Sequence, residues 1–211
     1  MPNYCSNKLV IKGSKAALAK FAATLGEGGE FLLAQTHPVP EAFVGISCGG
    51  CPINGKMVTS WRVTADGKSV AIPAKELSSL NSKYGAANQL DWCIGHWGTK
   101  WDVTSDTVLT VGEKEIYGWF DTAWSPPVKW LVYVSEMFPT LTFTLYFSEG
   151  GMEFYGSFSA KNGSSKDMTR TDFWNPENIN SDTESGDYDP ESNLTKKCKE
   201  FIHNHGLHIG G

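Results

Sequence analysis

The 211-residue chain is short of basic charge and of long apolar runs. Lys and Arg together number 18 against 23 Asp and Glu, and the formal net charge of -5 gives no broad attraction to nucleic-acid phosphates or anionic membranes. No apolar run approaches the ~20 residues that span a bilayer. Residues 1–5 carry neither the basic region nor the apolar stretch of a signal peptide. We therefore expect a cytoplasmic protein.

Familiar catalytic motifs are also missing. The sequence contains no Gly-x-Ser-x-Gly, no phosphate-binding glycine loop and no paired-histidine zinc motif. Asp102 and Asp121 could form a pair of carboxylates, but nothing in the sequence fixes the distance between them. The absences favour a protein that is not an enzyme.

The cysteines are odd in number, so they cannot all pair within one chain. In a reducing cytoplasm we expect free thiols. Cys48-Gly49-Gly50-Cys51 is half of a zinc site or a redox pair, and Cys198 and His203 are the candidate remaining zinc ligands. A single Cys-x-x-Cys is a weak motif that here follows no strand-to-helix turn, so we favour free or reversibly oxidised thiols and expect no cofactor.

Tryptophan is plentiful, and five of the eight lie between residues 90 and 127. The phrases at 97–102 and 120–127 mix large rings, small hydroxyls and a carboxylate, which suits either a rigid core with satisfied polar groups or a lined pocket. Packing and capping are the favoured interpretation, because buried tryptophans and capping residues have routine structural roles. If a pocket exists, the candidate ligand- or partner-binding residues are Trp97, Lys100, Trp101, Asp102, Asp121, Trp124 and Ser125.

Apolar periodicity predicts the order of strands and helices. Strands are expected at 8–12, 107–112, 115–123, 141–147 and 152–158, and helices at 15–25 and 125–138, with Ser14 and Ser125 as N-caps. The α+β plan is βαββαβ, an antiparallel sheet with two helices on one face, plus an added strand. An insertion at about 30–96 should hold a loop at 45–55, a hairpin at 59–72 and helices at 74–84 and 88–96.

The chain is predicted to divide at about residue 160. Residues 1–160 would form the sheet domain, and 161–211 an acidic loop with a short helix near 194–205 packed on it. No basic residue lies between Arg170 and Lys196. A solvated loop is the favoured interpretation, and the alternative is a decoy whose carboxylates imitate nucleic-acid phosphates for a basic partner. The candidate partner-binding acids are Glu177, Asp182, Glu184, Asp187 and Asp189.

Three phrases, at residues 1–7, 97–102 and 122–127, resemble the YubB-type (Api-like) ferredoxin-like proteins of phages and plasmids. The resemblance covers roughly residues 1–160 and implies the ferredoxin-like fold that the order of elements also predicts. It also implies a mobile genetic element, whose small accessory proteins often bind and block host defence proteins. The hairpin at 59–72 and the acidic tail depart from the family pattern. The fold name implies no iron–sulfur cluster.

Three functions are therefore expected in order of preference. The first is a non-enzymatic binding protein of a mobile element that inhibits a host protein, such as a defence component, in the bacterial cytoplasm. The second is a small-molecule or nucleotide-binding protein, or an enzyme, that uses the tryptophan-lined region around Lys100 and Asp102. The third is single-stranded nucleic-acid binding through the sheet face, against which the negative net charge argues.

Overall fold

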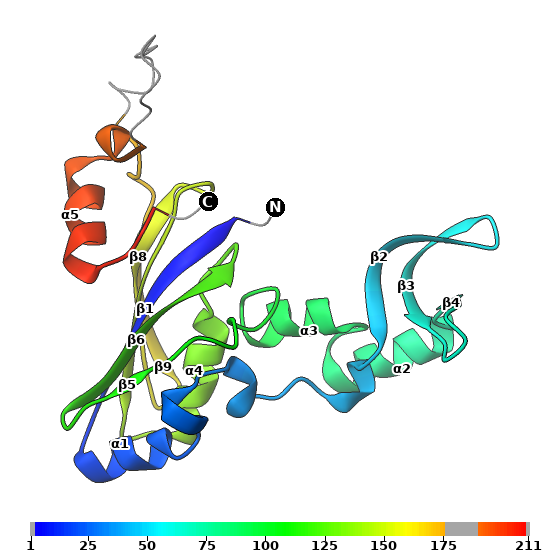
Figure 1. Cartoon of the computed structure of the whole chain (residues 1–211), viewed down its shortest axis with the longest axis horizontal. Coiled ribbons are helices and arrows are strands. Elements are labelled where there is room, and N and C mark those ends of the chain that lie inside the picture. The colour runs from blue at the N-terminus through cyan, green and yellow to red at the C-terminus, as the bar shows by residue number, and fades with distance from the viewer. Residues whose placement is uncertain (1–2, 176–189, 210–211) are drawn as a thin grey trace.

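The body of the molecule is a six-stranded antiparallel sheet in the order β5-β6-β1-β7-β8-β9 (Figure 1). The computed structural model describes residues 3–175 and 190–209. Along the chain, β1, α1, β5, β6, α4 and β7 follow the ferredoxin-like βαββαβ plan, and the predicted fold class is confirmed. The bounds are β1 (Tyr4–Lys12), α1 (Lys15–Ala22), β5 (Thr110–Val111), β6 (Glu115–Ala123), α4 (Val128–Met137), β7 (Thr142–Glu149), β8 (Phe154–Lys161) and β9 (Ser164–Arg170).

The main core lies between the sheet and the two helices α1 and α4. On β7, Phe143, Leu145 and Phe147 alternate with half-buried residues and are buried toward the helices. Phe21 of α1 meets Phe143 edge-to-face, with ring centroids 5.7 Å apart. Each such buried side chain contributes about 1.5–3 kcal/mol by leaving water, so the alternation of β7 sets which face of the sheet becomes the core.

The two helices begin differently from one another. Ser14 caps α1 as predicted, because its hydroxyl accepts the Ala17 N–H at 3.3 Å. The predicted Ser125 cap on α4 is wrong. Pro127 is the N-cap residue of α4, and the Ser125 hydroxyl donates instead to the Gly98 carbonyl at 2.6 Å. Its hydrogen bond ties the two tryptophan phrases together and leaves the helix start uncapped by a side chain.

A second, smaller core covers the opposite face of the sheet. It is formed under α5 (Lys196–His205), which follows the 3₁₀ turn η4 (Pro190–Asn193). The Thr195 hydroxyl accepts the Cys198 N–H at 3.2 Å, so it starts α5 as an N-cap. Tyr146 of β7 stacks on His205 with ring centroids 3.8 Å apart. The buried members of this cluster are Tyr155, Phe173, Leu194, Cys198, Ile202 and Leu207.

Strand β9 corrects the prediction of a loop from residue 161. It pairs with β8 from Ser164 to Arg170 through the turn Asn162-Gly163, whose φ angles are 48° and 76°. These positive values at both central residues are those of a type I′ hairpin, for which Asn-Gly is the preferred dipeptide. All of the strand's side chains are exposed, so no apolar alternation marks it in the sequence. The five predicted partner-binding acids between 177 and 189 lie outside the described residues.

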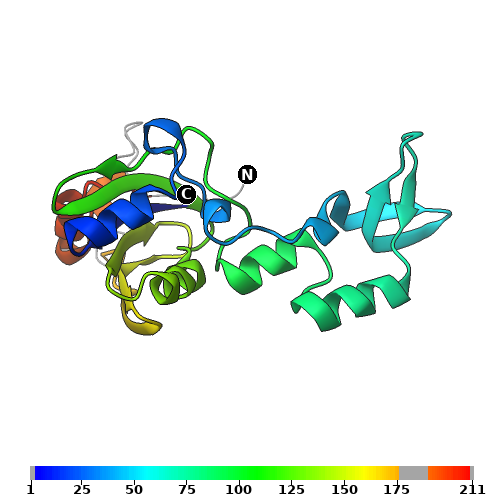
Figure 2. The ribbon, with the colours of Figure 1, turned by 90° about the horizontal axis from the view of Figure 1, so that it is seen from below.

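The chain from η3 (Glu41–Phe43) to α3 (Gln89–His96) forms an arm that extends from the body, whereas the segment that holds η1 and η2 lies against the body (Figures 1 and 2). The arm holds the second sheet, which has the order β2-β3-β4. The predicted hairpin and both predicted helices are present, but the predicted loop at 45–55 is wrong, since β2 pairs there with β3. The glycines of β2 concealed this strand, and Asn54-Gly55 forms a second turn with φ angles of 49° and 75°. The bounds are η1 (Glu27–Gly29), η2 (Leu33–Gln35), η3 (Glu41–Phe43), β2 (Ile46–Ile53), β3 (Lys56–Val63), β4 (Ser69–Ala71), α2 (Ala74–Tyr84) and α3 (Gln89–His96).

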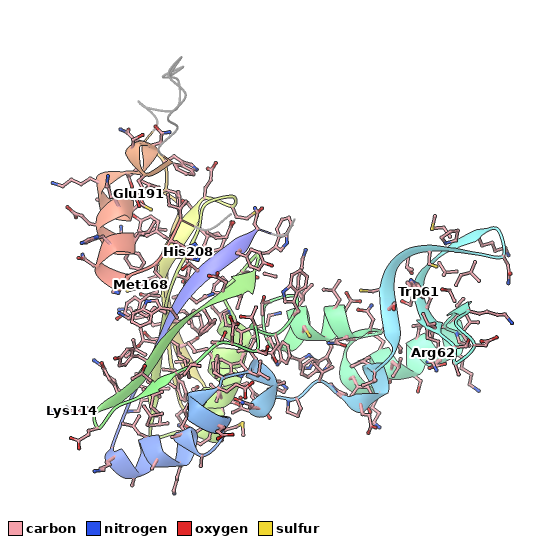
Figure 3. All side chains as sticks on the ribbon, in the orientation of Figure 1. Trp61, Arg62, Lys114, Met168, Glu191 and His208 are labelled. Carbon is pink, nitrogen blue, oxygen red and sulfur yellow. The ribbon has the colours of Figure 1, made fainter. Side chains whose placement is uncertain are left out.

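The arm is stabilised by its own contacts. Arg62 of β3 forms an ion pair with Glu76 of α2, joining the small sheet to the helix beside it. Figure 3 labels Arg62 in the arm and His208 at the other end of the molecule. None of the helices in the described ranges combines the length and apolar character that crossing a bilayer requires.

Candidate functional site

The two tryptophan phrases meet beside the end of β6, and part of what they supply is structural. Trp97 is 1% exposed, and its indole N–H donates to the His37 carbonyl at 3.0 Å. The Thr99 hydroxyl donates to the Ala123 carbonyl at 3.1 Å, next to the bond between Ser125 and Gly98. The polar atoms at these positions have hydrogen-bond partners within the fold, as the packing interpretation predicts.

Asp102 holds a turn of the chain together. Its carboxylate accepts the backbone N–H groups of Leu33 at 2.7 Å and Ala34 at 3.0 Å, and also its neighbour's, Val103, at 2.8 Å. Burial raises the pKa of Asp102, and the three N–H donors oppose that rise. The carboxylate therefore anchors η2, which lies on the body of the molecule before the arm begins, to the segment after the Trp97–Asp102 phrase.

Lys100 and Trp124 form a cation–π pair. The Lys100 ammonium lies 4.2 Å from the centroid of the Trp124 ring. Trp124 has a φ of 71°, an uncommon value for a residue with a side chain, and its backbone N–H donates to the Asn3 carbonyl at 2.9 Å. The N-terminal segment and Lys100 thus hold a partly exposed indole in an unusual backbone conformation.

A groove of about 380 Å³ lies at the β6 edge of the sheet. We name it the edge groove. Aromatic rings from three separate segments form its walls: Tyr4 begins β1, Trp119 lies on β6, and Trp101 precedes the stretch that runs along β6. The three side chains are 39%, 46% and 42% exposed, respectively. The remaining lining residues are Asp102, Thr104, Asp106, Thr107, Val108, Phe120 and Asp121.

Negative charge lies between these rings. The Thr104 hydroxyl lowers the pKa of Asp106 by hydrogen bonding, so this exposed carboxylate is ionised at neutral pH. The Asp121 carboxylate accepts a hydrogen bond from the His208 imidazole, with 2.8 Å between Oδ1 and Nε2. This hydrogen bond raises the pKa of His208. Of the described residues that line the groove, none is Lys or Arg. The site can therefore offer rings and carboxylates to a cation.

The segment after α5 brings His208 into contact with Asp121, which lines the groove. The His208 N–H donates to the Ser6 hydroxyl at 3.3 Å, and the Ser148 hydroxyl donates to the His208 carbonyl at 2.5 Å. Ser6 and Ser148 are paired across β1 and β7, so the segment after α5 is attached to the middle of the sheet (Figure 3). Protonation of one imidazole thus affects one wall of the groove.

The groove unites some of the predicted site residues and separates others. Trp101, Asp102 and Asp121 line it, while Lys100 and Trp124 pair beside it. The other lining residues were not among the predicted candidates, and they include two aromatic rings and a carboxylate, those of Tyr4, Trp119 and Asp106. Trp119 had a signal in the alternation of β6, where it is exposed between two buried neighbours.

The predicted zinc ligands do not converge. Cys48 and Cys51 lie on β2 in the arm, whereas Cys198 and His203 lie on α5 at the opposite end of the molecule (Figures 1 and 2). Cys198 is buried in the second core. Among the described residues, no three metal-ligating side chains form a group that could hold an ion. The four predicted residues therefore cannot ligate one shared zinc ion in this fold.

The sheet face under α5 is already occupied in part. The Trp119 indole N–H donates to the His205 carbonyl at 3.0 Å, and the Lys8 ammonium lies 4.8 Å from the centroid of the same ring. His205 also covers Tyr146. Rings on which nucleic-acid bases would stack are thus engaged by the chain itself.

Comparison with known proteins gives a family model and a solved structure similar to this chain. A family model described as a ferredoxin-like domain in Api92-like protein matches residues 96–189, a segment that includes β5, β6, α4, β7, β8 and β9. Among solved structures, the chain is similar to protein api92 from Yersinia pseudotuberculosis at 12% identity, with a TM-score of 0.47, over 80% of this chain and 98% of that chain. No curated protein matches the chain. The family description agrees with the observed sheet, and it names a fold without an activity.

Proposed function

We propose that the protein is a non-enzymatic binding protein whose edge groove takes an arginine or lysine side chain from a protein partner. The observation that carries the proposal is the interleaving of the exposed Tyr4 and Trp101 rings with the carboxylates of Asp106 and Asp121. Trp119 completes the wall, but the Lys8 ammonium already lies 4.8 Å from its ring centroid. Aromatic faces attract guanidinium and ammonium groups, and carboxylates complete their charge. Tryptophan, tyrosine and charge-complementary pairs also dominate the energetics of protein interfaces.

Asp106 and Asp121 are the carboxylates that such a cation would meet. Asp102 already accepts hydrogen bonds from three backbone N–H groups. It therefore adds negative potential to the groove but is not a free acceptor for a ligand. The excess of five acidic charges over the whole chain would steer a basic partner toward the surface. We place the protein in a mobile genetic element, with a host protein such as a defence component as partner; the sequence resemblance supports this part of the proposal.

The other two functions have weaker support. A nucleotide would bring its phosphates against Asp106 and Asp121. Lys100, the one positively charged residue among the predicted ligand-binding candidates, lies over the Trp124 ring and does not line the groove. Single-stranded nucleic acid on the sheet face would compete with α5 for Tyr146 and with Lys8 for Trp119. A protein cation therefore fits the lining best.

The test uses two short peptides that differ only at one central residue, arginine or its neutral isostere citrulline. Binding to the full chain is followed by tryptophan fluorescence and calorimetry. We expect a clear preference for the arginine peptide, and its loss in Trp101→Ala and Asp106→Asn, because these substitutions remove a ring and a carboxylate from the groove. Asp66→Asn is the matched control, since it removes the same charge from the exposed turn of the arm.

Two outcomes would contradict the proposal. Equal binding of the arginine and citrulline peptides would show that the groove does not recognise a cation. Undiminished arginine preference in both groove variants would place the recognition elsewhere. For a partner in the host, a photo-crosslinking residue at position 101 should capture one protein reproducibly. The same residue at position 63, where Val63 is exposed on the arm, should not capture that protein.

A further inference from the structure

We propose that Cys48 and Cys51 form a reversible disulfide, which makes the arm a thiol–disulfide modification site. Both cysteines lie on β2, in the segment Cys48-Gly49-Gly50-Cys51. This inference is independent of the edge groove and of any partner bound there. It depends on the pairing between β2 and β3.

A β-bulge brings the two cysteines to the same face of the small sheet. Cys48 is opposite Ser60 and Cys51 is opposite Val58, so three steps along β2 correspond to two steps along β3. In a regular strand, residues three apart point to opposite faces. Because Ser60 and Val58 are two apart on a strand that rises about 3.3 Å per residue, their partners are separated by roughly 6.6 Å. This separation is at the upper end of the Cα range of about 4.4–6.8 Å that disulfides bridge, so bond formation requires the bulge to tighten toward the usual separation of about 5.5–6 Å.

Glycine makes the bulge possible. Gly49 has a φ of 115°, which side-chain-bearing residues rarely adopt, and a Cβ there would meet no atom within 4 Å. The requirement at this position is therefore conformational. A Cβ at Gly50 would lie 3.2 Å from Met57 Sδ, at the flexible end of an exposed side chain. A side chain at Gly49 should therefore disturb the bulge, whereas a side chain at Gly50 should not.

Exposure sets these two thiols apart from the others. Cys48 is exposed and Cys51 is half-buried, whereas Cys5, Cys93 and Cys198 are buried. Burial raises the pKa values of all three buried thiols, to about 12 for Cys93 and Cys198. Since the thiolate is the reactive form, oxidation should be confined to Cys48 and Cys51.

The oxidant is a low-molecular-weight disulfide of the glutathione class. The Cys48 thiolate attacks one sulfur of that disulfide, forms a mixed disulfide and displaces one small thiolate. The Cys51 thiolate then attacks the Cys48 sulfur, forms the Cys48–Cys51 bond and displaces the second small thiolate. The two protons of the protein thiols end on the two released small thiols. Two protein sulfurs are oxidised, and the two sulfurs of the small disulfide are reduced.

The experiment equilibrates the full-length protein in reduced and oxidised glutathione at a series of ratios. Free thiols are then alkylated, and the peptide holding residues 48–51 is examined by mass spectrometry. We expect this peptide to lose two hydrogens without gaining glutathione, and to recover them with dithiothreitol. Cys48→Ser and Cys51→Ser should instead carry a single glutathione on the remaining thiol.

Two glycine variants test the geometry. Gly49→Val disfavours the bulge, so its disulfide should require a ratio at least about tenfold more oxidising. Gly50→Ala should behave as the wild-type protein. Alkylation of Cys93, which is buried on α3, reports whether the arm remains folded, and Gly49→Ala replaces the valine variant if Cys93 becomes reactive. Wild-type protein that yields only mixed or intermolecular disulfides, or Gly49 variants that oxidise as readily as wild type, would overturn the proposal.

Discussion

Replacing Asp102 by alanine should destabilise the protein strongly although part of the side chain faces a groove. The carboxylate accepts the N–H groups of Leu33, Ala34 and Val103 at 2.7, 3.0 and 2.8 Å. Truncation would remove all three acceptor contacts at once. It would also release η2 from the segment that follows Trp101.

The magnitude follows from opposing contributions. Hydrogen bonds to a charged group contribute about 1.5–3 kcal/mol each, so three set an upper limit of about 4–9 kcal/mol. Desolvation of the carboxylate, which also raises its pKa, offsets part of that sum, and in the variant water can enter the space that the carboxylate leaves beside the N–H groups. We expect a net loss of about 2–4 kcal/mol, comparable with one N-cap and one further hydrogen bond.

Urea denaturation and amide hydrogen exchange would measure this loss. The midpoint of thermal unfolding should fall by roughly 4–16 °C, and the amides of Leu33 and Ala34 should exchange faster than those of β7. Asp102→Asn, which keeps one acceptor oxygen, should lie between the alanine variant and wild type. Asp106→Ala is the control and should leave the urea midpoint nearly unchanged, since its side chain is exposed. An Asp102→Ala protein as stable as this control would refute the anchoring role and leave the carboxylate available to a ligand.

Three further predictions concern the surroundings of the groove and the second core. A double-mutant cycle of Lys100→Ala and Trp124→Ala in thermal unfolding should give a coupling energy of about 0.5–1 kcal/mol. Additive effects of the two substitutions would show that the cation–π pair contributes nothing to stability. Because Asp121 raises the pKa of His208 in the folded state, the stability from this pair is complete below about pH 6.5 and is lost as the pH rises through the raised pKa. NMR titration of His208 should accordingly give a lower pKa in Asp121→Asn, and an unchanged value would exclude the contact. Ile202→Ala, at a position 6% exposed under α5, should cost about 2–4 kcal/mol in urea denaturation, whereas a loss below about 0.5 kcal/mol would mean that α5 is not packed on the sheet.

The strands that the sequence predicted well are those with a buried face. β7 alternates Phe143, Leu145 and Phe147 with threonine and tyrosine, and the structure buries that set. The missed strands, β2 and β9, have little or no buried face, so their pairing depends on backbone hydrogen bonds. Each joins its neighbour through an Asn-Gly turn, at 54–55 and at 162–163. The dipeptide was therefore a better signal for these strands than side-chain periodicity.

The candidate site was partly predictable because one of its walls is continuous in sequence. Trp101 and Asp102 come from the tryptophan-rich stretch, and Asp121 comes from its second phrase. Tyr4 reaches the groove only because β1 pairs with β6, placing Tyr4 opposite Ala123. That pairing is a property of the folded sheet, so sequence spacing alone could not bring Tyr4 and Trp119 to one surface.

The arrangement of the sheet explains why recognition should occur at the β6 edge. α1 and α4 cover one face, and α5 covers part of the other. At the far edge, β9 pairs with β8 on one side and exposes charged side chains, which discourage further strands from adding to this edge. At the near edge, β5 is only two residues long, and beyond it β6 faces the stretch that carries Trp101 and Asp106. A partner that reads rings and carboxylates together therefore finds them where the sheet ends early, which is the physical reason to seek its contacts in the edge groove.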